Sequence, residues 1–160
     1  MGVYRGFHYP LPLWFSNGLA HYYSRKVESK FISARIQDTE SVDKDTQNDW
    51  YDKVFKRARH EGATIAFAEL AAMDDWNAFG FHAHTQSWSR MEFLVERDPQ
   101  KVGLMLDKMK RMPASGDWSG DGARLRKMTP KLLHEVFELD AETFDAQWRD
   151  WVRKHYPKRK

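Results

Sequence analysis

The chain contains no cysteine among its 160 residues. Disulfides, thiol nucleophiles and thiolate metal ligands are therefore excluded, and a metal site would have to use His, Asp or Glu. Because the absence of cysteine fits an oxidising or a reducing compartment, the localisation stays open. Proline is scarce, with six residues, and no apolar run approaches the roughly 20 residues that a membrane-spanning helix needs. We therefore expect a chain that does not span a membrane.

Apolar residues make up 41% of the chain and charged residues 31%, which is typical of a folded domain with amphipathic elements. At this length we expect one domain, formed by residues 1–152, and a basic tail at 153–160. The net charge is +3, and removing the five basic residues of the last eight positions leaves −2. A body so close to neutral does not favour nucleic acid as a partner, because phosphate attraction would depend on the tail alone.

Apolar residues recur every three or four positions over most of the chain, which predicts amphipathic helices. The first is expected from Pro12 to about Lys30. Asp98-Pro99 is expected to open a later helix, Thr129-Pro130 to cap residues 131–139, and Asp140 to cap the last helix. The predicted fold is all-α, a single compact domain of about six helices.

Other segments are expected to lie outside the helices or to break their regularity. Residues 113–123 form the clearest loop, and residues 31–37 fit a short strand as well as the end of the first helix. Gly18 lies inside the first helix, where it costs about 1 kcal/mol relative to alanine and predicts the close approach of another helix. Tryptophan and methionine side chains at helical spacing are expected to form the core.

Histidines are the natural candidates for a metal site, but their spacing gives weak signals. His82-Ala83-His84 is expected just before a helix, with no acidic residue at ligand spacing. His60-Glu61 resembles the start of an HExxH motif, but Gly62, Ala63 and Thr64 follow, so the second histidine is absent. Neither a P-loop, nor a GxGxxG fingerprint, nor a GxSxG elbow occurs. Composition and spacing therefore predict no complete active site.

Three stretches, taken together and in this order, resemble a known family. They are "LPLWFSNGLAHYYS" (11–24), "AHTQSWSRMEFLVERDPQKV" (83–102) and "LLHEVFELDAETFDAQWRDWVRKHY" (132–156). The first is similar to the glutamate helix of gluzincin-type zinc metallopeptidases, and more narrowly of peptidase-MA-like families of unknown function. The second resembles the family's helix that packs against the metal-site helices, and the third resembles its closing helix pair. The resemblance implies the C-terminal helical half of such a peptidase domain.

The chain departs from the family's pattern at the metal site. Asn17 stands where the family has the glutamate that is its third zinc ligand, and the HExxH helix would lie before Met1. A carboxamide is a poor zinc donor, and a single ligand does not hold the ion. His21 stands where the family places a second acidic residue. The resemblance therefore implies a surviving cleft without metal or other cofactor, which we expect to be lined by Trp14, Asn17, His21, Gln86 and Trp88.

Three functional hypotheses follow. The first is a catalytically incomplete metallopeptidase-like domain that binds a protein or peptide partner, or serves as a scaffold. The second is a zinc metallopeptidase whose HExxH segment lies in an upstream segment or in a partner chain, and in this case zinc would be the cofactor. The third is an interaction module that uses the basic tail on nucleic acid or another polyanion.

Overall fold

The computed structural model describes residues 8–27, 49–60 and 62–158. These residues form seven α-helices and no strand, which confirms the all-α class. The helices are α1 (Leu13–Val27), α4 (Trp50–Ala58), α5 (Phe67–Ala72), α6 (Phe81–Arg97), α7 (Pro99–Lys110), α8 (Trp118–Phe137) and α9 (Ala141–His155), followed by the short 3₁₀ helix η1 (Tyr156–Lys158). The strand considered for residues 31–37 lies outside the described residues. Within the described segments, no helix is long and apolar enough to cross a bilayer.

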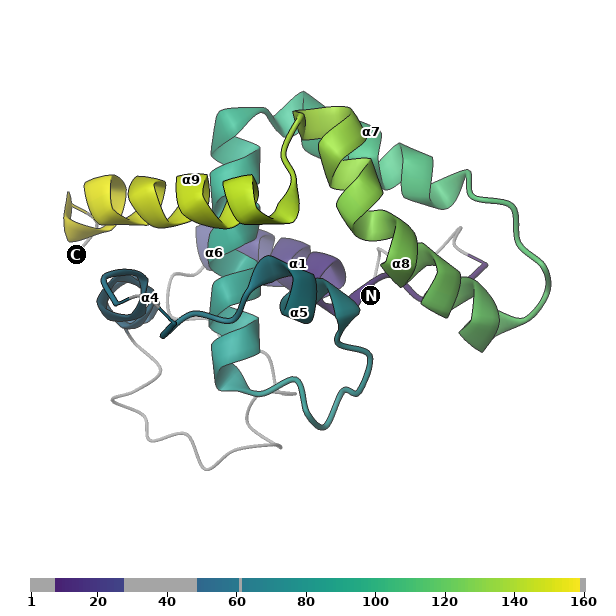
Figure 1. The fold of residues 1–160 in the computed structure, drawn as a ribbon, viewed down its shortest axis with the longest axis horizontal. Coiled ribbons are helices and arrows are strands. Elements are labelled where there is room, and N and C mark those ends of the chain that lie inside the picture. The colour runs from purple at the N-terminus through teal and green to yellow at the C-terminus, as the bar shows by residue number, and fades with distance from the viewer. Residues whose placement is uncertain (1–7, 28–48, 61, 159–160) are drawn as a thin grey trace.

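Helix α6 is the centre of the fold. It contacts α1, α4, α7 and α9, and the ribbon shows α1 and α9 crossing it (Figure 1). Because other helices cover it from several directions, every residue from Ala83 to Leu94 is buried. The middle of α6 therefore has no solvent-facing stripe, although its sequence contains many polar residues. The positions of these buried polar groups therefore determine whether the interior can form a functional site.

The packing of α1 against α6 depends on Gly18. A Cβ atom at this position would lie 2.8 Å from the backbone oxygen of Ser87 and 3.1 Å from Cβ of Met91. Distances this short are not available to a methyl group, so the two helices approach as closely as they do because residue 18 has no side chain. The close approach predicted from this glycine is confirmed.

Side-chain caps fix two of the helix starts as predicted. Asp98 accepts hydrogen bonds from the backbone N–H groups of Gln100 and Lys101, each at 3.0 Å, and Pro99 occupies the first turn of α7. Asp140 accepts from the backbone N–H of Thr143 at 2.7 Å at the start of α9. Both caps satisfy N–H groups that have no partner within the helix.

The prediction for the segment before α9 was wrong in two respects. Thr129-Pro130 does not begin a helix, because α8 runs continuously from Trp118 to Phe137 with Pro130 inside it. The Thr129 hydroxyl is buried and donates to the Leu125 carbonyl at 3.0 Å instead of capping. The loop predicted for 113–123 is also shorter than expected, because α8 already begins at Trp118.

A tertiary contact explains the early start of α8. Gly122 packs so closely on Pro10 that an added Cβ would lie 2.5 Å from the proline Cγ. Asp121 is buried and accepts hydrogen bonds from the backbone N–H and the hydroxyl of Ser115, at 2.7 and 2.9 Å. These contacts hold a glycine-rich segment in helical form against its low intrinsic propensity.

Most of the expected core residues are buried. Trp14, Trp50, Trp88 and Trp148 are all buried, as are Met91, Met105, Met109 and Met112. Trp118, which was expected in the loop at 113–123, has 51% of its surface exposed at the start of α8. The boundary predicted after residue 152 falls inside α9, which continues to His155, and Tyr156 beyond it is buried. Tyr156 is therefore packed on the domain, whereas Pro157 and Lys158, the last described residues, are exposed.

Candidate functional site

Asn17, the position that the resemblance equates with a zinc ligand, lies on the buried side of α1. Its side-chain nitrogen donates to the backbone carbonyl of Leu13, one turn earlier, at 2.8 Å. The residue is 8% exposed. The amide is thus folded back along its own helix, where it satisfies a local hydrogen bond.

His21 forms a buried pair with His84 of α6. The distance from His21 Nε2 to His84 Nδ1 is 3.0 Å, and one ring donates to the other. Aromatic rings surround the pair, with Trp50 at 5.1 Å from His21 and Phe79 at 4.9 Å from His84, centroid to centroid. The pair is therefore a polar contact enclosed by apolar surface between the two most extensively packed helices.

Burial controls the protonation of both histidines. Loss of solvation, with added repulsion from His84 and Arg25, lowers the pKa of His21 to about 3. Loss of solvation alone lowers the pKa of His84 to about 4. At neutral pH both rings are uncharged, so each can donate one hydrogen bond and accept one.

The expectation for His82 and His84 needs correction. Both residues lie in the first turns of α6, not before a helix. His82 is exposed, and its Nε2 lies 2.6 Å from Nη2 of Arg57, whereas His84 is buried against His21. Two residues apart on a helix, the rings point in different directions and do not converge on one ion.

The other residues expected in the cleft are also buried, and Trp88 lies near the histidine pair, whereas Trp14 and Gln86 have other neighbours. Trp88 contacts the Trp50 ring at 5.4 Å, on the same side of α6 as the histidine pair. Trp14 packs edge-to-face on Phe67 of α5 at 4.9 Å. The Gln86 side-chain oxygen accepts from the backbone N–H of Ile65 at 2.9 Å. The structure places these side chains in the core, which differs from the open groove expected from the sequence.

Arg90 and Asp145 form a buried ion pair that the sequence did not suggest. Arg90 Nη2 lies 2.7 Å from Asp145 Oδ1 and 2.6 Å from the carbonyl of Ile65, and its guanidinium lies 3.9 Å from the Trp148 ring centroid. The second carboxylate oxygen of Asp145 accepts from the backbone N–H of Phe67 at 2.7 Å. This pair connects α6, α9 and the start of α5. The one sign of this pair in the sequence is a charged residue among the apolar residues of each helix.

A directed chain of hydrogen bonds lies nearer the end of α6. The Trp148 indole N–H donates to the Ser89 hydroxyl at 2.9 Å, and that hydroxyl lies 2.5 Å from the Tyr156 hydroxyl. Tyr156 in turn donates to Glu92 at 2.9 Å, and Tyr51 donates to the other Glu92 oxygen at 3.1 Å. Burial, with the nearby Glu92 carboxylate, raises the pKa of Tyr156 well above its usual range, so the phenol stays protonated.

These interior groups do not form a recognisable catalytic arrangement. In the part of the chain that the structure describes, no three His, Asp or Glu side chains gather as a metal-binding group. Most of these polar atoms are hydrogen-bonded to one another or to backbone groups, which is how buried polar groups stabilise a specific packing. The side-chain nitrogen of Gln86 is an exception, because it has no hydrogen-bond partner among the described residues.

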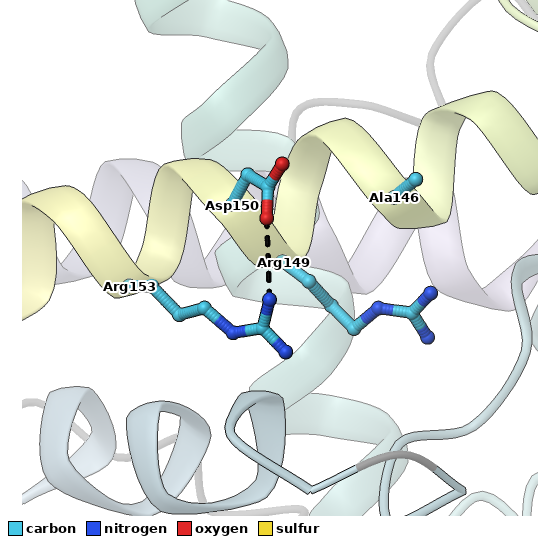
Figure 2. A pocket seen from close by; sticks show the side chains of 4 residues that line it. All are labelled: Ala146, Arg149, Asp150 and Arg153. Atoms are coloured by element: carbon cyan, nitrogen blue, oxygen red, sulfur yellow. Dashed lines mark hydrogen bonds and ion pairs between the residues drawn. The ribbon is translucent and has the colours of Figure 1, made fainter.

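A pocket on the surface of α9 is the other candidate site. It has a volume of about 290 Å³ and is lined by Ala146, Arg149, Asp150 and Arg153 (Figure 2). Arg153 was expected in the basic tail, and Arg149 carries no signal in the sequence, because an arginine on a polar helix face is usually solvated.

Comparisons with protein families, with curated proteins and with solved structures found no match to this chain.

Proposed function

We propose that this chain is a non-catalytic helical domain that works by binding a protein or peptide, and that it is related to the C-terminal half of gluzincin-type peptidases. The resemblance of three ordered segments motivates the proposed relationship. In this proposal, the helix that would present a zinc ligand has become a structural element.

The engagement of Asn17 and His21 inside the core is the observation that carries the proposal. The Asn17 amide donates to the Leu13 carbonyl, and His21 is hydrogen-bonded to His84 among aromatic rings. A zinc ligand must present a free lone pair toward an ion that other ligands share. The His21–His84 hydrogen bond joins α1 to α6, and the Asn17 hydrogen bond lies within α1. Both uses favour a structural role over catalysis.

The placement of the first two resembling segments also supports the proposal. The segment around Gly18 packs directly on the backbone of Ser87, so the stretch 11–24 and the stretch 83–102 are neighbours. In the family, the corresponding helices are expected to pack together. The contact is compatible with that expectation, and generic helix packing would produce it too.

Metal analysis of the purified chain tests the proposal. The protein is expressed in zinc-supplemented medium, its metal content is measured by elemental mass spectrometry, and hydrolysis is assayed on a mixed peptide library with and without chelator. We expect zinc far below one equivalent and no chelator-sensitive hydrolysis, because an amide and an occupied imidazole do not grip the ion.

The Asn17→Glu variant sharpens this test, since it restores the carboxylate and leaves the rest of the site unchanged. We expect the variant to remain metal-free, because a single carboxylate does not provide enough ligands to hold zinc. Stoichiometric zinc together with chelator-sensitive hydrolysis in the unaltered chain would overturn the proposal. Zinc that appears only when a second protein carrying HExxH is added would support the alternative of a divided peptidase.

A further inference from the structure

The pocket on α9 contains two arginines that differ in how much of their hydrogen-bonding capacity is already used. Figure 2 shows both side chains leaving the same side of α9, with Asp150 bound to Arg153. The Arg153 Nε donates to the Ala58 carbonyl at the end of α4, at 3.0 Å, which places the pocket beside that helix end. The pocket is separate from the buried residues discussed above, and the inference drawn from it does not depend on the peptidase resemblance.

Arg149 does not pair with Asp145, because Asp145 is used by groups in the core. Asp145 lies four residues earlier on α9, at the spacing where an arginine and an aspartate usually pair. Both Asp145 oxygens are already taken, one by Arg90 and the other by the Phe67 N–H. Arg149 consequently makes no hydrogen bond or ion pair with any residue that the structure describes. Its guanidinium offers five N–H donors to the pocket.

Arg153 is partly committed. Its Nε binds the Ala58 carbonyl, and its Nη1 lies 3.2 Å from Asp150 Oδ1. The Nη2 group keeps N–H donors for a ligand. Because Asp150 balances the charge of Arg153, the lining residues that the structure describes carry a net charge of about one unit, which is supplied by Arg149.

We propose that this pocket binds a carboxylate group. The fork of Arg149 matches the two oxygens of a carboxylate, and Nη2 of Arg153 adds a further donor. A single excess positive charge suits a monoanion, and the adjacent Asp150 carboxylate repels a second negative charge on the ligand. The volume of about 290 Å³ is at the lower end for ligand pockets, so it suits a small acid or one acidic side chain.

Titration followed by NMR of the arginine Nε–H resonances tests the proposal with two probes. One probe is propionate, and the other is the peptide acetyl-Gly-Glu-Gly-amide with its Gln counterpart as the neutral control. We expect saturable shifts of the Arg149 and Arg153 resonances, with a dissociation constant in the millimolar range because the bound group has few atoms. Binding of propionate alone would assign a free small acid, and binding of the Glu peptide alone would assign a peptide-borne carboxylate.

Variants on one helix separate site binding from general charge attraction. R149Q should weaken binding by about ten-fold or more, and R149K should weaken it several-fold because the fork is lost while the charge remains. K154Q removes one positive charge from an exposed position on the same helix, and it should leave the affinity within about two-fold. The proposal is overturned if neither probe saturates, if R149Q binds as K154Q does, or if inorganic phosphate binds more tightly than both carboxylates.

Discussion

Lowering the pH from 8 to 5 should destabilise this protein strongly, because two buried histidines must stay neutral for α1 to pack on α6. Their ring nitrogens lie 3.0 Å apart. Burial lowers the pKa of His21 to about 3 and that of His84 to about 4, from 6.5 in both cases. Below pH 6.5 the unfolded chain therefore binds more protons than the folded one. The stability that both histidines contribute is complete above this pH and is lost as the pH falls toward 4 and then 3.

The size of the effect follows from the difference in proton binding. A pH of 5 lies about 1.5 units below the pKa of each histidine in the unfolded chain. This difference corresponds to a loss of about 2 kcal/mol per histidine, at about 1.36 kcal/mol per unit. Two histidines together give about 4 kcal/mol. This is a large part of the roughly 5–15 kcal/mol that stabilises a domain of ordinary size.

Urea unfolding followed by tryptophan fluorescence at pH 8, 7, 6 and 5 measures the effect. The quantity compared is the difference in unfolding free energy between pH 8 and pH 5, since each substitution also changes the absolute stability. His21→Gln and His84→Gln should each remove about half of the pH dependence. His60 is exposed, and His60→Gln serves as the control that leaves the difference unchanged. An equal pH dependence in all four proteins would refute the reasoning.

Two further predictions concern helix packing and the buried ion pair. Gly18→Ala should lower the unfolding free energy by about 1–2 kcal/mol, because the new Cβ meets the Ser87 oxygen, whereas Gly103→Ala on α7 meets no atom within 4 Å and should raise it by about 0.5–1 kcal/mol. Urea unfolding measures both, and a more stable Gly18→Ala protein would contradict the packing argument. Asp145→Ala should cost about 3–5 kcal/mol because Arg90 is left charged inside the core. Glu135→Gln breaks an exposed pair with Lys108 and should leave the unfolding midpoint almost unchanged, and similar losses in both variants would show that burial does not matter here.

Local chemistry made several elements predictable. Asp98-Pro99 was predicted to open a helix and Asp140 to cap one, because proline suits the first turn and a short acidic side chain accepts from the free N–H groups there. Both predictions are confirmed, and both aspartates accept such hydrogen bonds. The close approach at Gly18 was also predicted correctly, since a glycine inside a helix has few other uses. In each case the signal lies within one helical turn of the residue.

The features that were missed depend on contacts distant in the sequence. Pro130 suggested a helix start, but α8 continues through it, and its first turns are supported by the Gly122 contact with Pro10. His21 and His84 are 63 positions apart, and Arg90 and Asp145 are 55 apart, so no periodic pattern could pair them. For the same reason the residues expected to line an open cleft proved to be buried, because covering helices are not visible in local spacing.

The burial of α6 has a consequence for recognising relatives of this chain. A helix with one solvent-exposed face tolerates substitution at about half of its positions. From Ala83 to Leu94, no position of α6 lies on such a face, because every residue is buried. Its polar members also fix the rotation of the helix about its own axis, since a turn by one residue would separate His84 from His21 and Arg90 from Asp145. We therefore expect distant homologues to diverge first on α7 and α9, and to be identified best by the pattern of this inner segment.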